Sequence, residues 1–127
     1  MITLSTIQDI NRTAPFNEWA GIEVIEAANG QAEIRMAWLP EAAQYSGYLH
    51  AGMIGALLDT VCGFAAATVA GQVLASHYSV NCLRPAIGDA FIAKGKVTKA
   101  GTRQVFTTAE LFAVKGDQTQ LVATGET

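Results

Sequence analysis

Residues 50–71 read HAGMIGALLDTVCGFAAATVAG, and Asp59 carries the only formal charge among them. An isolated carboxylate removed from water costs roughly several kcal/mol unless other groups compensate. Burial also raises the pKa of a carboxylic acid towards the range that is useful for proton transfer. Asp59 is therefore the first candidate for a catalytic residue.

The apolar stretch 51–71 has about the length of a transmembrane helix, which needs roughly 20 residues. Asp59 near its middle would be penalised by about 3 kcal/mol in a bilayer. The stretch is also rich in Ala, Gly and Thr, and no Lys or Arg flanks either end. We therefore favour a helix buried inside a globular protein, with no membrane partner, over a membrane span.

The segments before this helix predict a short helix and a hairpin. Leu4, Ile7 and Ile10 have helical spacing and end before Pro15, so we expect a helix over Leu4–Arg12. Two stretches of strand-like residues, 22–28 and 31–38, flank Asn29-Gly30, which is a strong hairpin signal.

The segments after the helix predict four strands, over residues 74–83, 90–98, 103–114 and 119–125. Their short connections favour a meander in which each strand pairs with the next along the chain. The fold class is therefore α+β: about six antiparallel strands wrapped around one long apolar helix, with a short N-terminal helix. Residues 1–127 form a single domain, because no linker or repeat divides them.

Charge is distributed unevenly along a chain of net charge -3. Residues 84–103 hold five bases and one acid, whereas residues 1–41 hold six acids and two bases. Two interpretations of the basic segment remain open: it binds an anionic ligand, or it forms a solvated strand face. An acidic chain with so few bases is not expected to bind nucleic acid.

Two further features bear on the compartment. Cys62 and Cys82 have no metal-ligand spacing, so we expect reduced thiols in the core. The first residues, Met1-Ile2-Thr3-Leu4-Ser5, lack the pattern of a secretory signal, which favours a cytoplasmic location.

The helix brings a second chemical element to Asp59. Gly52 and Asp59 lie within roughly 20° of each other in projection, on a strip of small residues that includes Ala56 and Gly63. The N–H groups of Ala51 and Gly52 at the helix start suit a developing oxyanion. About 10 Å of axial rise separates these amides from Asp59. Two helices packed antiparallel across a two-fold axis would bring them together in two equivalent sites.

These residues resemble the motif of PaaI-like acyl-CoA thioesterases of the hotdog superfamily. The resemblance rests on Gln44-Tyr45-Ser46-Gly47-Tyr48-Leu49-His50-Ala51-Gly52 with Leu58-Asp59, and on Leu83-Arg84-Pro85-Ala86-Ile87-Gly88-Asp89. It implies hydrolysis of acyl-CoA thioesters without metal or cofactor, in a homodimer or a dimer of dimers. A hotdog module that binds acyl-CoA or acyl chains without catalysis is the alternative.

The resemblance also implies roles for individual residues. Asp59 would act as general base or nucleophile, the amide at Ala51 would polarise the thioester carbonyl, and His50 would support the helix entrance. The remaining candidates are Gly52 and Gln44 for catalysis, and Tyr45, Gly47, Arg84, Lys94 and Lys96 for substrate binding. Two residues depart from the family pattern: Ala51 stands where the motif has Gly, and Gln44 where it has Asn.

Overall fold

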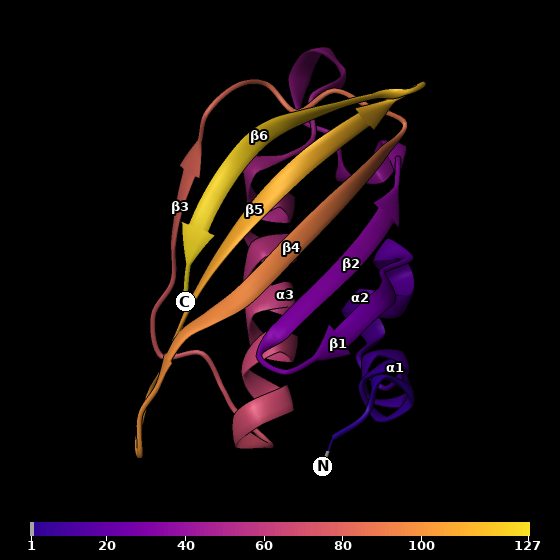
Figure 1. Ribbon diagram of the computed structural model, residues 1–127. Coiled ribbons are helices and arrows are strands. Elements are labelled where there is room, and N and C mark those ends of the chain that lie inside the picture. The colour runs from indigo at the N-terminus through magenta and orange to yellow at the C-terminus, as the bar shows by residue number, and fades with distance from the viewer. Residues whose placement is uncertain (1) are drawn as a thin grey trace.

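A computed structural model describes residues 2–127 as one six-stranded antiparallel sheet curved around a long helix (Figure 1). The strand order across the sheet is β1-β2-β4-β5-β6-β3. The helices are α1 (Leu4–Arg12), α2 (Pro15–Ala20) and α3 (Ala51–Ala70), and the strands are β1 (Glu23–Ala28), β2 (Gln31–Ala37), β3 (Ser79–Cys82), β4 (Ala90–Ala100), β5 (Val105–Lys115) and β6 (Gln118–Glu126). The predicted fold class is confirmed in its strands and in both predicted helices.

Helix α3 lies against one face of the sheet and forms the centre of the core (Figure 1). Its bulky side chains face the strands, and Leu57, Leu58 and Val61 are each at most 2% exposed. Gly95 of β4 lets the two backbones approach, because a Cβ at that position would lie 3.0 Å from the carbonyl oxygen of Val61. By length and composition α3 is a candidate membrane span, yet 56% of it is buried inside the protein, as in the core helix of a globular fold.

The predicted hairpin joins β1 and β2. Asn29 and Gly30 both have positive φ, 54° and 76°, which is the requirement of a type I′ turn. Helix α1 packs along β1, where the Gln8 side-chain amide donates to the carbonyl of Val24 at 3.0 Å. Helix α1 therefore packs at this edge of the sheet, whereas β3 at the opposite edge pairs with β6 on one side and has no strand beside it on the other among residues 2–127.

The predicted meander is wrong for β3. Strands β4, β5 and β6 follow one another as expected, but β3 pairs with β6 rather than with β4. Residues 83–89 carry the chain across the end of the sheet, and the Leu49 N–H donates to the Ala86 carbonyl on the way. The predicted strand over 74–83 is also shorter, because residues 74–78 run from the end of α3 to the sheet edge without a strand to pair with.

Two local features were not expected. Helix α2 was missed: it begins at Pro15 and ends at Ala20, and Gly21 with its φ of 72° provides a left-handed cap. Cys62 is buried, but Cys82 is exposed on β3, so the expectation of two core thiols is wrong for Cys82.

Candidate active site

The segment before α3 forms a tight loop closed by Gln44. Its backbone N–H donates to the Tyr48 carbonyl at 2.7 Å, and its side-chain amide donates to the Leu49 carbonyl at 3.3 Å. Between them, Ser46 and Gly47 adopt positive φ and turn the chain back on itself. Tyr45 is 85% exposed at the tip of this loop. Gln44 therefore supports the path of the chain into α3.

His50 is the N-cap of α3. Its Nδ1 accepts a hydrogen bond from the Gly52 N–H at 2.8 Å. This bond satisfies one of the N–H groups at the helix start that have no acceptor within the helix. Because Nδ1 accepts, the proton of the neutral imidazole lies on Nε2. The expected support of the helix entrance by His50 matches this geometry.

The two amides at the helix tip are consequently not equivalent. The Gly52 N–H points to His50, whereas the Ala51 N–H has no acceptor within residues 2–127. Ala51 is exposed, so this donor is open to a ligand. Its position at the positive end of the helix dipole suits an oxygen that gains negative charge.

Asp59 lies on the side of α3 that faces away from the sheet, half-buried among small residues. Its carboxylate has no hydrogen-bond or ion-pair partner among residues 2–127. Desolvation by burial raises the pKa of Asp59 above its ordinary value of 3.8. A carboxyl group in this state can accept a proton from water more readily than a fully solvated one.

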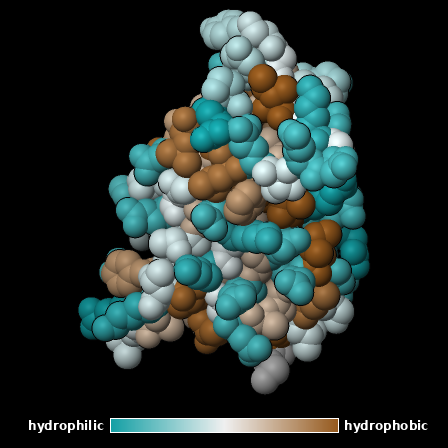
Figure 2. Space-filling model, turned by 45° about the horizontal axis from the view of Figure 1, so that its top comes forward, coloured by the Kyte–Doolittle hydropathy of each residue, from teal (hydrophilic) through white to brown (hydrophobic). Residues whose placement is uncertain are grey.

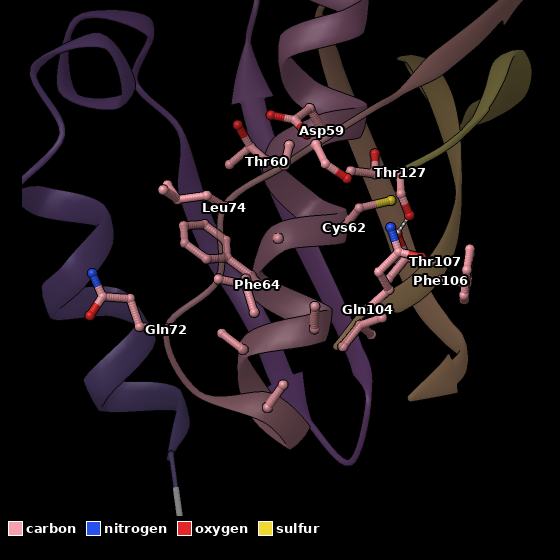
Figure 3. A pocket seen from close by; sticks show the side chains of 18 of the residues that line it. Asp59, Thr60, Cys62, Phe64, Gln72, Leu74, Gln104, Phe106, Thr107 and Thr127 are labelled. Atoms are coloured by element: carbon pink, nitrogen blue, oxygen red, sulfur yellow. Dashed lines mark hydrogen bonds between the residues drawn. The ribbon is translucent and has the colours of Figure 1, made fainter. Parts of the chain in front are cut away.

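Asp59 and Thr60 project into a broad hollow of about 1510 Å³ (Figure 3). The walls of this hollow come from α3 and the segment that follows it, from α1 and α2, from the β4–β5 connection with the start of β5, and from the end of the chain after β6. The helix tip borders a second, smaller pocket that contains His50 and Gly52 but not Asp59. Within one chain the structure thus places Asp59 and the Ala51 amide along the same helix, about 12 Å apart in axial rise.

The basic residues proposed for substrate binding are divided between two places. Arg84 lies on the segment that crosses the sheet end next to the start of α3, and it is exposed. Lys94 and Lys96 flank Gly95 on β4; because Gly95 packs on α3, both lysines lie on the outer face of the sheet. Lys94 there approaches Glu33 at 3.9 Å and lies 5.6 Å from the centre of the Phe112 ring. One chain alone does not bring these lysines to Asp59.

Hydrophobic side chains on that outer face are not gathered into one continuous patch (Figure 2). Figure 2 shows hydrophobic and hydrophilic side chains interspersed over the sheet and over the end at which α3 begins. Scattered apolar side chains of this kind are normal on a protein surface.

Cys62 also lines the Asp59 hollow, but it lacks the features of a nucleophile. Burial raises the pKa of its thiol, against weaker opposing hydrogen bonds from Thr107 and Thr127. Thr107 is itself bonded, since its hydroxyl donates to the Thr127 carbonyl at 2.7 Å. Within residues 2–127, no group of three or more His, Cys, Asp or Glu is placed to hold a metal ion.

Sequence reasoning missed two aromatic residues beside the helix tip. Phe16 and Trp19 of α2 line the smaller pocket together with His50 and Gly52. Their spacing of three residues directly after Pro15 was the available signal, because such a pair shares one face of a helix.

Comparison with known proteins places the chain in a family. A family model described as the thioesterase superfamily matches residues 46–120, which is more than half of the chain. The chain belongs to the thioesterase superfamily, a class of hydrolases, and its architecture is the hotdog fold.

Individual relatives agree with this assignment. A Saccharolobus solfataricus protein that is named provisionally as an esterase is 29% identical over 97 residues, which cover 75% of this chain and 69% of the relative. A thioesterase family protein from Silicibacter pomeroyi superposes with a TM-score of 0.88 at 27% identity, over 94% of this chain and 90% of the other. The PaaI protein from the phenylacetic acid degradation operon of E. coli shares the fold, with a TM-score of 0.81 at 22% identity over 96% and 90% of the two chains.

Proposed function

We propose that this protein hydrolyses acyl-CoA thioesters to the free acid and CoA. The observation that carries the proposal is Asp59: an unpaired, half-buried carboxyl group with a raised pKa, on the strip of α3 that faces away from the sheet. Membership of the thioesterase superfamily supports a hydrolase, and the resemblance of the helix motif to acyl-CoA thioesterases supports the finer substrate class.

In the proposed reaction, Asp59 takes a proton from a water molecule that adds to the thioester carbonyl. The carbonyl oxygen gains negative charge and accepts a hydrogen bond from the free N–H of Ala51. The C–S bond then breaks and CoA leaves as a thiolate, a good leaving group that needs little help from a general acid. Direct attack by the Asp59 carboxylate on the carbonyl is the other form of the same proposal.

The reaction requires two chains. Asp59 of one chain would meet the partner subunit's Ala51 if two α3 helices pack antiparallel across a two-fold axis. The small side chains of the strip around Asp59 allow such close packing, and the unpaired edge of β3 lies on one border of the molecule. We propose a homodimer, either alone or as half of a dimer of dimers, located in the cytoplasm.

The first test replaces the carboxylate. Purified protein is offered a panel of acyl-CoAs and the released thiol is measured. We expect Asp59→Asn to lower kcat/KM by about 10²- to 10⁴-fold, the usual contribution of a general base. The matched control is Asp117→Asn, which changes an exposed carboxylate in the turn between β5 and β6.

The second test removes the amide hydrogen without removing the helix. Ala51 is the first residue of α3, where proline is well tolerated, and His50 has a ψ of 138°, which suits the residue before a proline. Ala51→Pro should therefore fold and lower kcat by about 10²- to 10³-fold, as for loss of one oxyanion donor. Ala51→Gly keeps the N–H and serves as its control.

The alternative function, binding without catalysis, makes a different prediction. A silent module would release no thiol from any acyl-CoA but would still bind them in a calorimetric titration. Turnover that survives Asp59→Asn unchanged would refute the proposed mechanism.

A further inference from the structure

A small open pocket of about 210 Å³ lies between α2 and the tip of α3. It is lined mainly by Phe16, Trp19, Ala42, His50, Gly52 and Met53. His50 and Gly52 flank Ala51 in the chain, so the pocket adjoins the residue whose amide is free. No residue of this pocket other than His50 and Gly52 has a part in the mechanism above.

The aromatic wall of the pocket is exposed. Phe16 and Trp19 are 46% and 51% exposed, and their ring centres are 5.8 Å apart with the planes tilted by 47°. Exposed apolar area is unfavourable by about 25 cal/mol per Å². A single exposed ring needs no explanation, but two rings that line one pocket beside an open backbone donor form a binding surface.

Helix α2 is held firmly enough to present these rings in one place. The side-chain amide of Asn17 donates to the Asn11 side-chain oxygen at 3.0 Å, and Asn11 donates to the Ile22 carbonyl at 2.8 Å. Asn11 is only 5% exposed, so these bonds are shielded from water. A wall that is ordered before binding loses little conformational entropy when a ligand arrives.

We propose that this pocket is the acyl subsite of the enzyme, and that it selects a compact, flat and uncharged acyl group such as a benzoyl group. The inference rests on the proposed function, because it takes the thioester carbonyl to lie at the Ala51 amide. From there the acyl substituent extends over Gly52 towards Met53, Phe16 and Trp19.

Size and charge define the selected group. A volume of about 210 Å³ has room for one six-membered ring, and a long fatty chain would have to extend beyond the aromatic wall through the open side of the pocket. Aromatic rings prefer the tilted or offset contacts that Phe16 and Trp19 offer. The exposed carboxylate of Glu41 also lines the pocket and disfavours acyl groups that carry a second carboxylate.

The test compares two substrates in three proteins. Benzoyl-CoA and butyryl-CoA are assayed with the unaltered protein, with Trp19→Ala and with the control Ile25→Ala. Ile25 is 40% exposed on β1 and lies in neither hollow. We expect Trp19→Ala to lower kcat/KM for benzoyl-CoA by about tenfold, with a change of less than about threefold for butyryl-CoA. A fourth protein, Trp19→Phe, should keep most of the kcat/KM for benzoyl-CoA that Trp19→Ala loses. Ile25→Ala should affect neither substrate selectively.

A binding measurement keeps this test separate from the reaction. Phenacyl-CoA and 2-oxopentyl-CoA are thioethers that cannot be hydrolysed, and their affinities are measured by calorimetry with the same three proteins. If no acyl-CoA is turned over but Trp19→Ala selectively weakens phenacyl-CoA, the proposed function fails and the subsite stands. Equal effects of Trp19→Ala on the aryl and alkyl compounds, or no effect on either, would overturn the subsite.

Discussion

At the scale of single residues, Asp59 combines a chemical use with a cost in stability. Burial raises its pKa above 3.8, so the folded chain binds this proton more tightly than the unfolded chain does. The free energy of unfolding then falls as the pH rises from the ordinary pKa to the raised one. Below that window both states are protonated and the penalty is absent. Residues placed for chemistry often reduce stability in this way.

The direction of this pH dependence predicts how Asp59→Asn changes stability. The variant has no group to ionise, so its Tm should exceed that of the unaltered protein at pH 7, and the difference should shrink as the pH is lowered towards 3.8. Thermal unfolding followed by circular dichroism over this pH range measures the difference. Asp117→Asn, at an exposed position, should show no such trend. An unaltered protein that is the more stable of the two at neutral pH would contradict the argument.

At the scale of elements, the contact of α3 with the sheet depends on the absence of a side chain at Gly95. A Cβ there would lie 3.0 Å from the Val61 carbonyl oxygen and 3.1 Å from its carbon, so the strand and the helix would have to separate. This contact explains why a strand with good hydrophobic alternation contains a glycine.

Gly95→Ala should accordingly destabilise the protein by about 1–3 kcal/mol, the usual cost of overpacking a core. Urea denaturation at a fixed protein concentration measures the change in the free energy of unfolding. Lys96→Ala, on the opposite face of the same strand, should change it by less than about 0.5 kcal/mol. A neutral or stabilising Gly95→Ala would show that α3 shifts freely over the sheet.

The elements also show how far sequence reasoning reaches. Helix α1 was predicted with its observed bounds, and the Asn29-Gly30 turn was correct, because both depend on neighbours in the chain. The place of β3 next to β6 was not predicted, since an alternating pattern in residues 74–83 does not specify a partner. Asp59 and the helix tip were predicted as site residues from their spacing on one helix; the structure confirms that helix, and their roles stay a prediction. Trp19 was missed because its importance depends on a pocket shared with His50, far away in sequence.

At the scale of the whole molecule, one chain leaves the strip of α3 around Asp59 uncovered. Gly63 belongs to this strip, and a Cβ built on it meets no atom within 4 Å. A larger side chain at this position therefore fits within the single chain, and replacing glycine in a helix favours the helix by roughly 0.5–1 kcal/mol. The fold of the single chain therefore tolerates such a change, and a loss of oligomeric mass caused by it reports on contact with a second molecule. A loss of activity alone does not, because Gly63 lines the same hollow as Asp59.

Gly63→Arg tests the proposed dimer, because the single chain has room for the larger side chain and a close helix–helix contact does not. We expect the mass of the unaltered protein in analytical ultracentrifugation to be about twice the 13.4 kDa of one chain, and that of Gly63→Arg to be the mass of a monomer. Gly63→Arg should also lose at least about tenfold in activity. Gln118→Arg, exposed next to the β5–β6 turn, is the control for added charge. If Gly63→Arg changed neither mass nor turnover, the strip would not be an interface.

The free edge of β3 has a further consequence for assembly. Helix α1 packs along β1 at the opposite side of the sheet, where the Gln8 side chain donates to the Val24 carbonyl, so β3 offers the more open row of backbone hydrogen-bonding groups. When two copies pair through their β3 edges about a two-fold axis, each β3 edge is hydrogen-bonded to the other. No third copy can then join the combined sheet at β3. Growth into a fibril requires a second open row on every molecule, and α1 obstructs the β1 edge that would have to provide it.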